Sequence, residues 1–143
     1  MKPLRNIYHF AKTENIVIDR FPLQTRDALS VMDEEGDCFI AIDPSKIVND
    51  ADERTKLAHE LGHCVTGSFY NQYSCFDRRQ YHENRADKWG IRYLIALEDL
   101  DDAIASGCTT FWELAEHFGV TEQFMKKAVC YYTHGNVAAE LYF

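Results

Sequence analysis

The chain has 143 residues, of which 46% are hydrophobic and 27% are charged, a composition typical of one folded domain rather than of a disordered segment. Fifteen Lys and Arg against 23 Asp and Glu leave a net charge of −8, which argues against a primary role on nucleic acid or on an anionic membrane. No apolar run could span a bilayer and residues 1–10 carry no secretory signal, so we expect a cytoplasmic protein. The five cysteines are widely spaced and lack a CxxC pair, so we expect reduced thiols.

The first 50 residues combine one helix with three short strands. Apolar residues on one side predict a helix over residues 4–14. Apolar and β-branched runs predict strands over 16–19, 28–32 and 38–42, and the last two flank an acidic glycine turn that is typical of a hairpin. We therefore expect a short antiparallel sheet behind an N-terminal helix.

Helices dominate the remainder of the chain. Asn49 and Asp50 can cap a helix that begins at about residue 51, and Gly67 is a natural stop for it. A long aromatic loop is expected over 68–80. The other predicted helices cover residues 82–97, 98–106, 110–118 and 121–132. This order of elements predicts a single α+β domain over 1–143, with a helix and sheet in 1–50, two long helices in 51–97 and a helical part in 98–143.

The most informative motif is His59-Glu60-Leu61-Gly62-His63, an HExxH sequence inside the best-capped predicted helix. Residues four apart lie on one helix face, so both imidazoles can reach one tetrahedral zinc ion. Glu60 points toward the flank of that ion, where it can take a proton from an attacking water without being a ligand. The pattern thus predicts a zinc site with Glu60 as general base. Two histidines on a solvated helix face are the plainer alternative.

A catalytic zinc needs a third protein ligand from a neighbouring element, and Glu83 is the best candidate. It lies 20 residues after His63, at the start of the next long predicted helix. Asp87, one turn later on the same face, can hold the free N–H of a zinc-bound histidine. Ala86 and Gly90 are small enough to let the two helices approach closely. The alternative is that both acids only favour the helix dipole.

With these residues the sequence resembles the ImmA/IrrE family of HExxH metallopeptidases, also known as the domain of unknown function 955. The resemblance depends on a strand over 39–43, on Arg54-Thr55 before the HELGH sequence, and on the Glu83–Asp87 segment, and it covers roughly residues 5–130. It departs at Leu94-Ile95-Ala96, where many members have an apolar residue, Met and Pro.

The resemblance implies a zincin-like fold in which His59, His63 and Glu83 hold Zn²⁺. It also implies Glu60 as general base and Asp87 as the partner of a zinc-bound histidine. Family members typically cleave helix-turn-helix repressors, so the expected substrate is a repressor-type transcription factor of a mobile element or a stress response. The expected protein acts without direct contact with nucleic acid or membrane.

Several aromatic and histidine side chains near the motif are further candidates for the site. His82 adjoins Glu83, but neighbouring residues on a helix point about 100° apart, so both cannot easily bind one ion. A hydroxyl donor to the developing oxyanion is another need of such a site, and simple packing is the plainer role for each candidate. The candidate donors are Tyr70, Tyr73 and Tyr81.

Two other classes of function compete with the peptidase. The first is a non-catalytic zinc-binding module, such as a component of a toxin–antitoxin pair, although a binding protein has no need of Glu60. The second is a DNA-binding regulator, because residues 111–132 have the spacing of a helix-turn-helix. Lys126 and Lys127 in that segment are offset by nearby glutamates, so we interpret it as a packed helical hairpin or as a surface that docks the partner.

Overall fold

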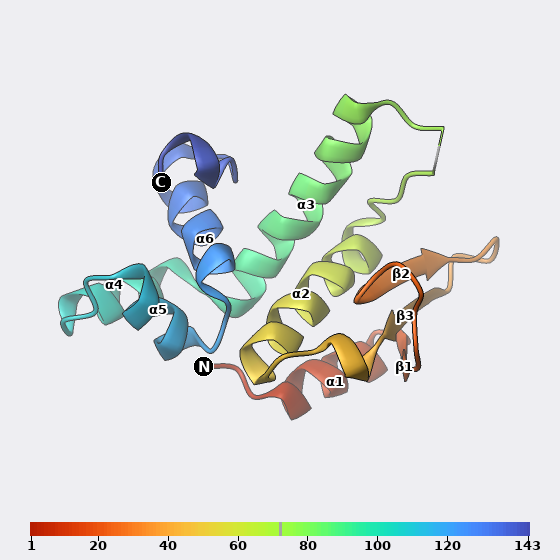
Figure 1. Ribbon diagram of the computed structural model, residues 1–143, viewed down its shortest axis with the longest axis horizontal. Coiled ribbons are helices and arrows are strands. Elements are labelled where there is room, and N and C mark those ends of the chain that lie inside the picture. The colour runs from red at the N-terminus through yellow and green to blue at the C-terminus, as the bar shows by residue number, and fades with distance from the viewer. Residues whose placement is uncertain (72) are drawn as a thin grey trace.

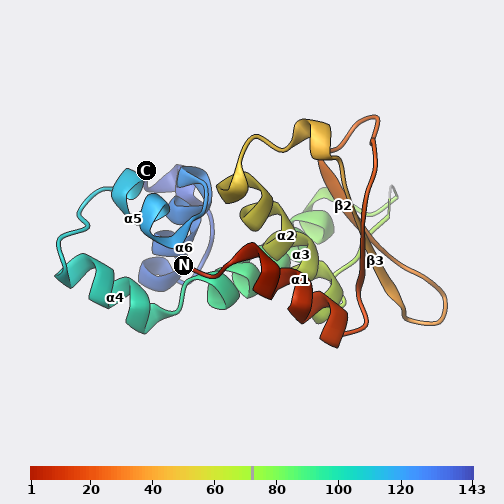
Figure 2. The same cartoon turned by 90° about the horizontal axis from the view of Figure 1, so that it is seen from below.

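The computed structural model describes residues 1–71 and 73–143 and has the α+β fold that the sequence predicts (Figure 1). The sheet lies at one end of the molecule and α4–α6 at the other, with α2 and α3 between them (Figures 1 and 2). The elements within the described residues are α1 (Leu4–Thr13), β1 (Val17–Arg20), β2 (Ala28–Met32), β3 (Cys38–Ile42), η1 (Pro44–Lys46), α2 (Asp50–Thr66), α3 (Phe76–Leu94), α4 (Leu97–Ala105), α5 (Phe111–Phe118), α6 (Glu122–His134) and η2 (Ala139–Leu141).

The sheet is mixed, which corrects the expected antiparallel arrangement. Its strand order is β1-β3-β2, with β2 antiparallel to β3 as the hairpin predicts and β1 parallel to β3. Cys38, Ile40 and Ile42 of β3 are buried, whereas β1 and β2 are more exposed, so the most apolar strand takes the centre. The residues of the turn predict only that β2 pairs with β3. The position of β1 is decided by the tertiary structure, in which the apolar β3 is covered by a neighbouring strand along each edge.

Helix α2 lies against the sheet and forms the middle of the core. Asn49 caps its start by accepting a hydrogen bond from the Asp52 N–H at 2.9 Å, and Gly67 ends it in the left-handed conformation with φ of 65°. Leu57 and Leu61 are fully buried against the apolar face of β3. This packing fixes the orientation of α2 and hence of His59, Glu60 and His63, which line the cleft described below.

Helix α3 begins at Phe76, so the predicted loop over 68–80 is too long and the helix predicted over 82–97 starts too late. Most residues of 76–81 are exposed, and a helix turn without an apolar stripe leaves no periodic signal in the sequence. The helix also ends earlier than predicted, at Leu94. The remaining predicted helices match the observed ones to within two residues.

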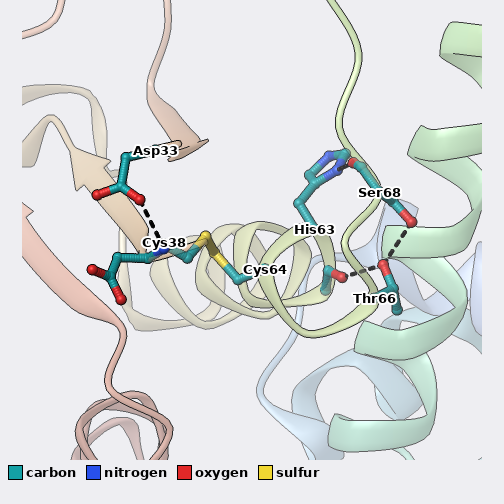
Figure 3. Close-up of a disulfide and its surroundings, with 8 residues drawn as sticks. Asp33, Cys38, His63, Cys64, Thr66 and Ser68 are labelled. Carbon is teal, nitrogen blue, oxygen red and sulfur yellow. Dashed lines mark hydrogen bonds between the residues drawn. A yellow bond between two sulfur atoms is a disulfide. The ribbon is translucent and has the colours of Figure 1, made fainter. Parts of the chain in front are cut away.

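A disulfide joins Cys38 of β3 to Cys64 of α2, which corrects the expectation that all thiols are reduced (Figure 3). The two residues are 26 apart in the sequence, yet their Cα atoms are 5.9 Å apart because α2 packs on the sheet. Spacing in the sequence carries no sign of this contact. Among the described residues the free thiols are Cys75, Cys108 and Cys130, of which Cys130 is buried.

The helices of the described residues differ from membrane spans in their combination of length and composition. None of them combines the length and the apolar composition needed to cross a bilayer.

Candidate metal centre

The two histidines of the HExxH motif face each other on α2. Because they are four residues apart, His59 Nε2 and His63 Nε2 lie 3.1 Å from one another. His63 is 6% exposed, and the side chain of His59 is 24% exposed at the edge of a cleft. Two ring nitrogens therefore converge on one point that solvent can reach.

Helix α3 brings the carboxylate of Glu83 to the same point. Glu83 Oε2 lies 2.7 Å from His59 Nε2 and 3.4 Å from His63 Nε2. The close approach depends on small residues at the helix crossing, since a Cβ on Gly62 would lie 2.9 Å from Ala86 Cα and overlap the Ala86 carbonyl. Gly62 of the HELGH sequence is thus required by the packing of α2 on α3.

The other ring nitrogen of each histidine already has a hydrogen-bond partner. His59 Nδ1 lies 2.8 Å from Asp87 Oδ1, and His63 Nδ1 lies 2.5 Å from the Ser68 carbonyl oxygen. A carboxylate and a carbonyl only accept, so both Nδ1 atoms donate, and in the neutral rings both Nε2 lone pairs face the point where Glu83 Oε2 also lies. Three acceptors that converge in this way repel one another unless a cation or a proton lies between them.

Sequence reasoning missed the contribution of Ser68. Gly67 turns the chain at the end of α2, and the fully buried Ser68 then folds back over the helix (Figure 3). The Ser68 N–H donates to the His63 carbonyl at 3.1 Å, while Thr66 Oγ1 lies 2.6 Å from Ser68 Oγ. The helix stop at Gly67 is the only sequence signal that could have indicated a carbonyl near His63.

The charges around the centre favour a bound cation. Burial alone would lower the pKa of His59, but its hydrogen bonds to the Asp87 and Glu83 carboxylates outweigh burial and raise the pKa to about 10. Burial would raise the pKa of Glu83, but hydrogen bonds from His59, His63 and Tyr70 hold it well below its usual range. The site thus keeps Glu83 ionised and favours positive charge at His59.

The donor set and its spacing fit a zinc ion. The three ligand atoms of His59, His63 and Glu83 lie within 4.8 Å of one another. Bonds of about 2.1 Å at tetrahedral angles place ligand atoms about 3.4 Å apart, and the contacts here range from 2.7 to 3.4 Å. Two imidazoles, one carboxylate and an open fourth position form the ligand set of a hydrolytic zinc site.

A second group of acids lies in the exposed turn of the β-hairpin and is unlike this centre. Asp33, Glu35 and Asp37 are all exposed there. Asp33 Oδ1 accepts the backbone N–H groups of Glu35 and Asp37, both at 2.9 Å. These contacts explain the acids as the chemistry of the turn.

Glu60 lies beside the centre without contacting it. It is 8% exposed and lines the cleft, and its carboxylate makes no hydrogen bond to any residue of the described part of the chain. Its negative charge contributes to raising the pKa of His59, which places it within electrostatic reach of the centre. A free acceptor in this place can take a proton from a bound water.

The centre opens into a cleft of about 680 Å³. One wall is formed by residues 25–30, which include the start of β2, and the opposite wall by α3 and the beginning of α6. Residues that contribute to the cleft include Arg26, Ala28, Ser30, Phe69, Tyr70, Thr121, Phe124 and Lys127. Segments far apart in the sequence thus meet around the HExxH helix.

The tyrosines and His82 are placed differently from one another. Tyr70 lines the cleft and donates its hydroxyl hydrogen to Glu83 Oε1 at 2.5 Å, whereas Tyr73 and Tyr81 are 86% and 57% exposed and lie outside the cleft lining. His82 stacks on Tyr70, and its buried Nδ1 has no partner in the described residues. The structure therefore brings only Tyr70 of the three tyrosines to the centre.

Together these features define a small zincin-like α+β domain with an HExxH helix. The chain matches the family model described as the IrrE N-terminal-like domain, Peptidase_M78, over residues 11–129. It therefore belongs to this family, which confirms the resemblance seen in the sequence and supports a metallopeptidase type of function. No curated protein matches the chain.

Proposed function

We propose that this protein is a zinc-dependent endopeptidase in which His59, His63 and Glu83 bind the metal. The observation that carries the proposal is the convergence of the two Nε2 atoms and Glu83 Oε2, with both Nδ1 atoms held by other partners. The preformed tautomers spare the site the reorganisation that metal binding would otherwise require.

The chemistry then divides between the metal and the chain. Held by His59, His63 and Glu83, a zinc ion would supply Lewis-acid chemistry to the scissile carbonyl and to an attacking water. Glu60 accepts the proton of that water and can return it to the leaving amine. Asp87 and the Ser68 carbonyl keep each imidazole in the tautomer that presents Nε2 to the centre.

The free edge of β2 supports binding of the substrate as an extended strand. Two backbone hydrogen bonds at the ends of the β2–β3 ladder show which residues of β2 are paired. The Asp43 N–H donates to the Asp27 carbonyl and the Asp33 N–H donates to the Asp37 carbonyl, both at 2.9 Å. The odd-numbered residues of β2 therefore direct their backbone groups toward β3. In an antiparallel ladder the intervening residues direct their backbone groups the other way. Ala28 and Ser30 therefore offer unpaired N–H and C=O groups to an added strand, and both line the cleft.

For the substrate we propose a helix-turn-helix repressor, as the family resemblance implies, and hence a cytoplasmic site of action. The non-catalytic zinc-binding module is the second candidate, and Glu60 argues against it because a pure binding site needs no free carboxylate beside the metal. A DNA-binding role is opposed by the net charge of −8 and by α6, which buries Phe124 and Met125.

The test separates metal binding from chemistry. Glu60→Gln should keep one zinc per chain but lose cleavage of a co-expressed helix-turn-helix repressor, as followed on gels. His59→Ala should lose most of the zinc in metal analysis, and His9→Ala, an exposed histidine on α1, serves as the matched control. Cleavage by Glu60→Gln at the parental rate would remove the peptidase proposal in favour of the binding module.

A further inference from the structure

A lysine of the C-terminal helical part reaches the metal centre through Asp87. Lys127 Nζ on α6 lies 3.0 Å from Asp87 Oδ2, while the other oxygen of the same carboxylate faces His59 Nδ1 at 2.8 Å. Each oxygen of Asp87 thus has its own donor. The three residues form a continuous chain from α6 to the imidazole that we propose as a metal ligand.

The surroundings distinguish this contact from an ordinary surface ion pair. The Asp87 side chain is 8% exposed, so its negative charge is largely removed from water. An exposed ion pair is worth little, whereas removing one member of a buried pair leaves an uncompensated charge. Lys127 supplies the positive charge beside Asp87 Oδ2, and its own side chain is 33% exposed at the wall of the cleft.

The position of Lys127 is set by the helix that carries the histidines. The buried Arg54 of α2 donates to the Gly119 carbonyl at 2.5 Å, and Thr55 Oγ1 accepts the Thr121 N–H at 3.1 Å. These two bonds pin the corner between α5 and α6 onto α2, about one turn before His59. They also give a physical role to the Arg54-Thr55 pair that the sequence resemblance singled out.

We infer that Lys127 is a positioning residue of the metal centre, which holds the Asp87 carboxylate in the plane that orients His59. The inference builds on the proposed function, since it concerns the same zinc site. With Lys127 in place, Oδ2 is anchored and the carboxylate cannot rotate away from Nδ1. Without Lys127, the buried Asp87 carboxylate keeps only its hydrogen bond with His59. The His59 ring can then rotate and move its Nε2 away from the metal centre.

The expected effect is on zinc affinity rather than on the fold alone. Loss of a direct outer partner of a metal-bound histidine typically costs 10- to 100-fold in affinity, so Asp87→Asn should weaken zinc binding by about that range. Lys127 acts one contact further from the metal than Asp87. Lys127→Met should therefore raise the zinc dissociation constant by about 10-fold, the smaller end of that range. Lys127→Arg keeps the charge and should restore most of the affinity.

The experiment is a double-mutant cycle in the full chain, with zinc dissociation constants measured by competition with a chromophoric chelator. Lys127→Met should lose its effect in the Asp87→Asn background, because the lysine acts only through that carboxylate. Lys126→Met is the matched control, since Lys126 lies over the Phe111 ring and away from the centre. Lys127→Gln, which keeps a donor without the charge, is the second variant, and circular dichroism checks that each chain is folded.

The outcomes distinguish a failure of the role of Lys127 from a failure of the proposed zinc site. A dissociation constant for folded Lys127→Met or Lys127→Gln within twofold of the parent would overturn the inference and leave the zinc site intact. An equal loss of affinity in the presence and absence of the Asp87 carboxylate would overturn it as well. A parental chain that binds no zinc would overturn the proposed function itself.

Discussion

The phenol of Tyr70 holds one oxygen of Glu83, at 2.5 Å, and leaves the other oxygen to face both histidines. The two oxygens of a single carboxylate are thereby given different partners. Burial and this hydrogen bond also raise the pKa of Tyr70, so the hydroxyl keeps its proton through neutral pH. The tyrosine thus orients the carboxylate that we propose as third metal ligand.

Replacing Tyr70 by Phe separates this orienting role from the oxyanion-donor role. If Tyr70 orients Glu83, Tyr70→Phe should weaken zinc binding by up to about 10-fold, because the carboxylate can then rotate. If it serves chiefly as an oxyanion donor, kcat should fall while zinc affinity stays at the parental level. Tyr73→Phe, at a residue that is 86% exposed, should change neither quantity.

The free edge of β2 predicts a substitution that blocks substrate without touching the sheet. Ser30→Pro removes an N–H that points away from β3, and proline is tolerated on edge strands at such positions. Cleavage of the repressor should fall at least about 10-fold, because an added strand loses a ladder hydrogen bond and meets the proline ring. Zinc content should stay at the parental level.

Ser30→Ala is the control for this change, since it removes the hydroxyl and keeps the backbone donor. It should cleave at nearly the parental rate. Equal cleavage by Ser30→Pro and Ser30→Ala would show that the substrate does not add to β2.

The disulfide between Cys38 and Cys64 should contribute measurably to stability. It closes a loop of 26 residues, and the loss of chain entropy in the unfolded state predicts about 3.5 kcal/mol. Cys38→Ala should lower the free energy of unfolding by about that amount, as measured by urea denaturation of the metal-free protein. Cys75→Ala, at an exposed free thiol, should leave it unchanged. Equal stability of the two variants would mean that the bond adds nothing in solution.

The decrease in the free energy of unfolding at acid pH should depend on Asp43, which anchors the loop at the mouth of the cleft. Its buried carboxylate accepts hydrogen bonds from the Leu23 N–H at 2.9 Å and from the Ser45 hydroxyl at 2.6 Å. The Ser45 and Leu23 donors lower the pKa of Asp43 below its ordinary 3.8. Its contribution is therefore complete above that value and is lost as the pH falls through the lower pKa of the folded state.

The measurement is urea unfolding of metal-free protein at about pH 5 and about pH 3. The parent should lose more stability across this interval than Asp43→Asn, which cannot titrate there. Asp101→Asn, at an exposed residue of α4, should retain the parental pH dependence. Identical slopes for the parent and Asp43→Asn would show that these hydrogen bonds do not favour the ionised carboxylate.

Local chemistry in the sequence was enough to determine the main helices, the β2–β3 hairpin and the family. These features depend on residues that are close together in the sequence, so they can be predicted without knowledge of the tertiary structure. They are the caps at Asn49 and Gly67, the apolar stripe of α2 and the i, i+4 spacing of His59 and His63. The start of α3 at Phe76 escaped prediction because its first turns are exposed and carry no apolar period.

The tertiary structure alone decided the features that join distant segments. The parallel pairing of β1 with β3, the bond between Cys38 and Cys64, and the Ser68 carbonyl behind His63 all depend on how α2 packs on the sheet and where its end folds back. The contact of Lys127 with Asp87 spans 40 residues and exists because α2 pins the start of α6 beside α3. Such contacts are set by burial and close packing of whole elements, and no local periodicity in the chain encodes them.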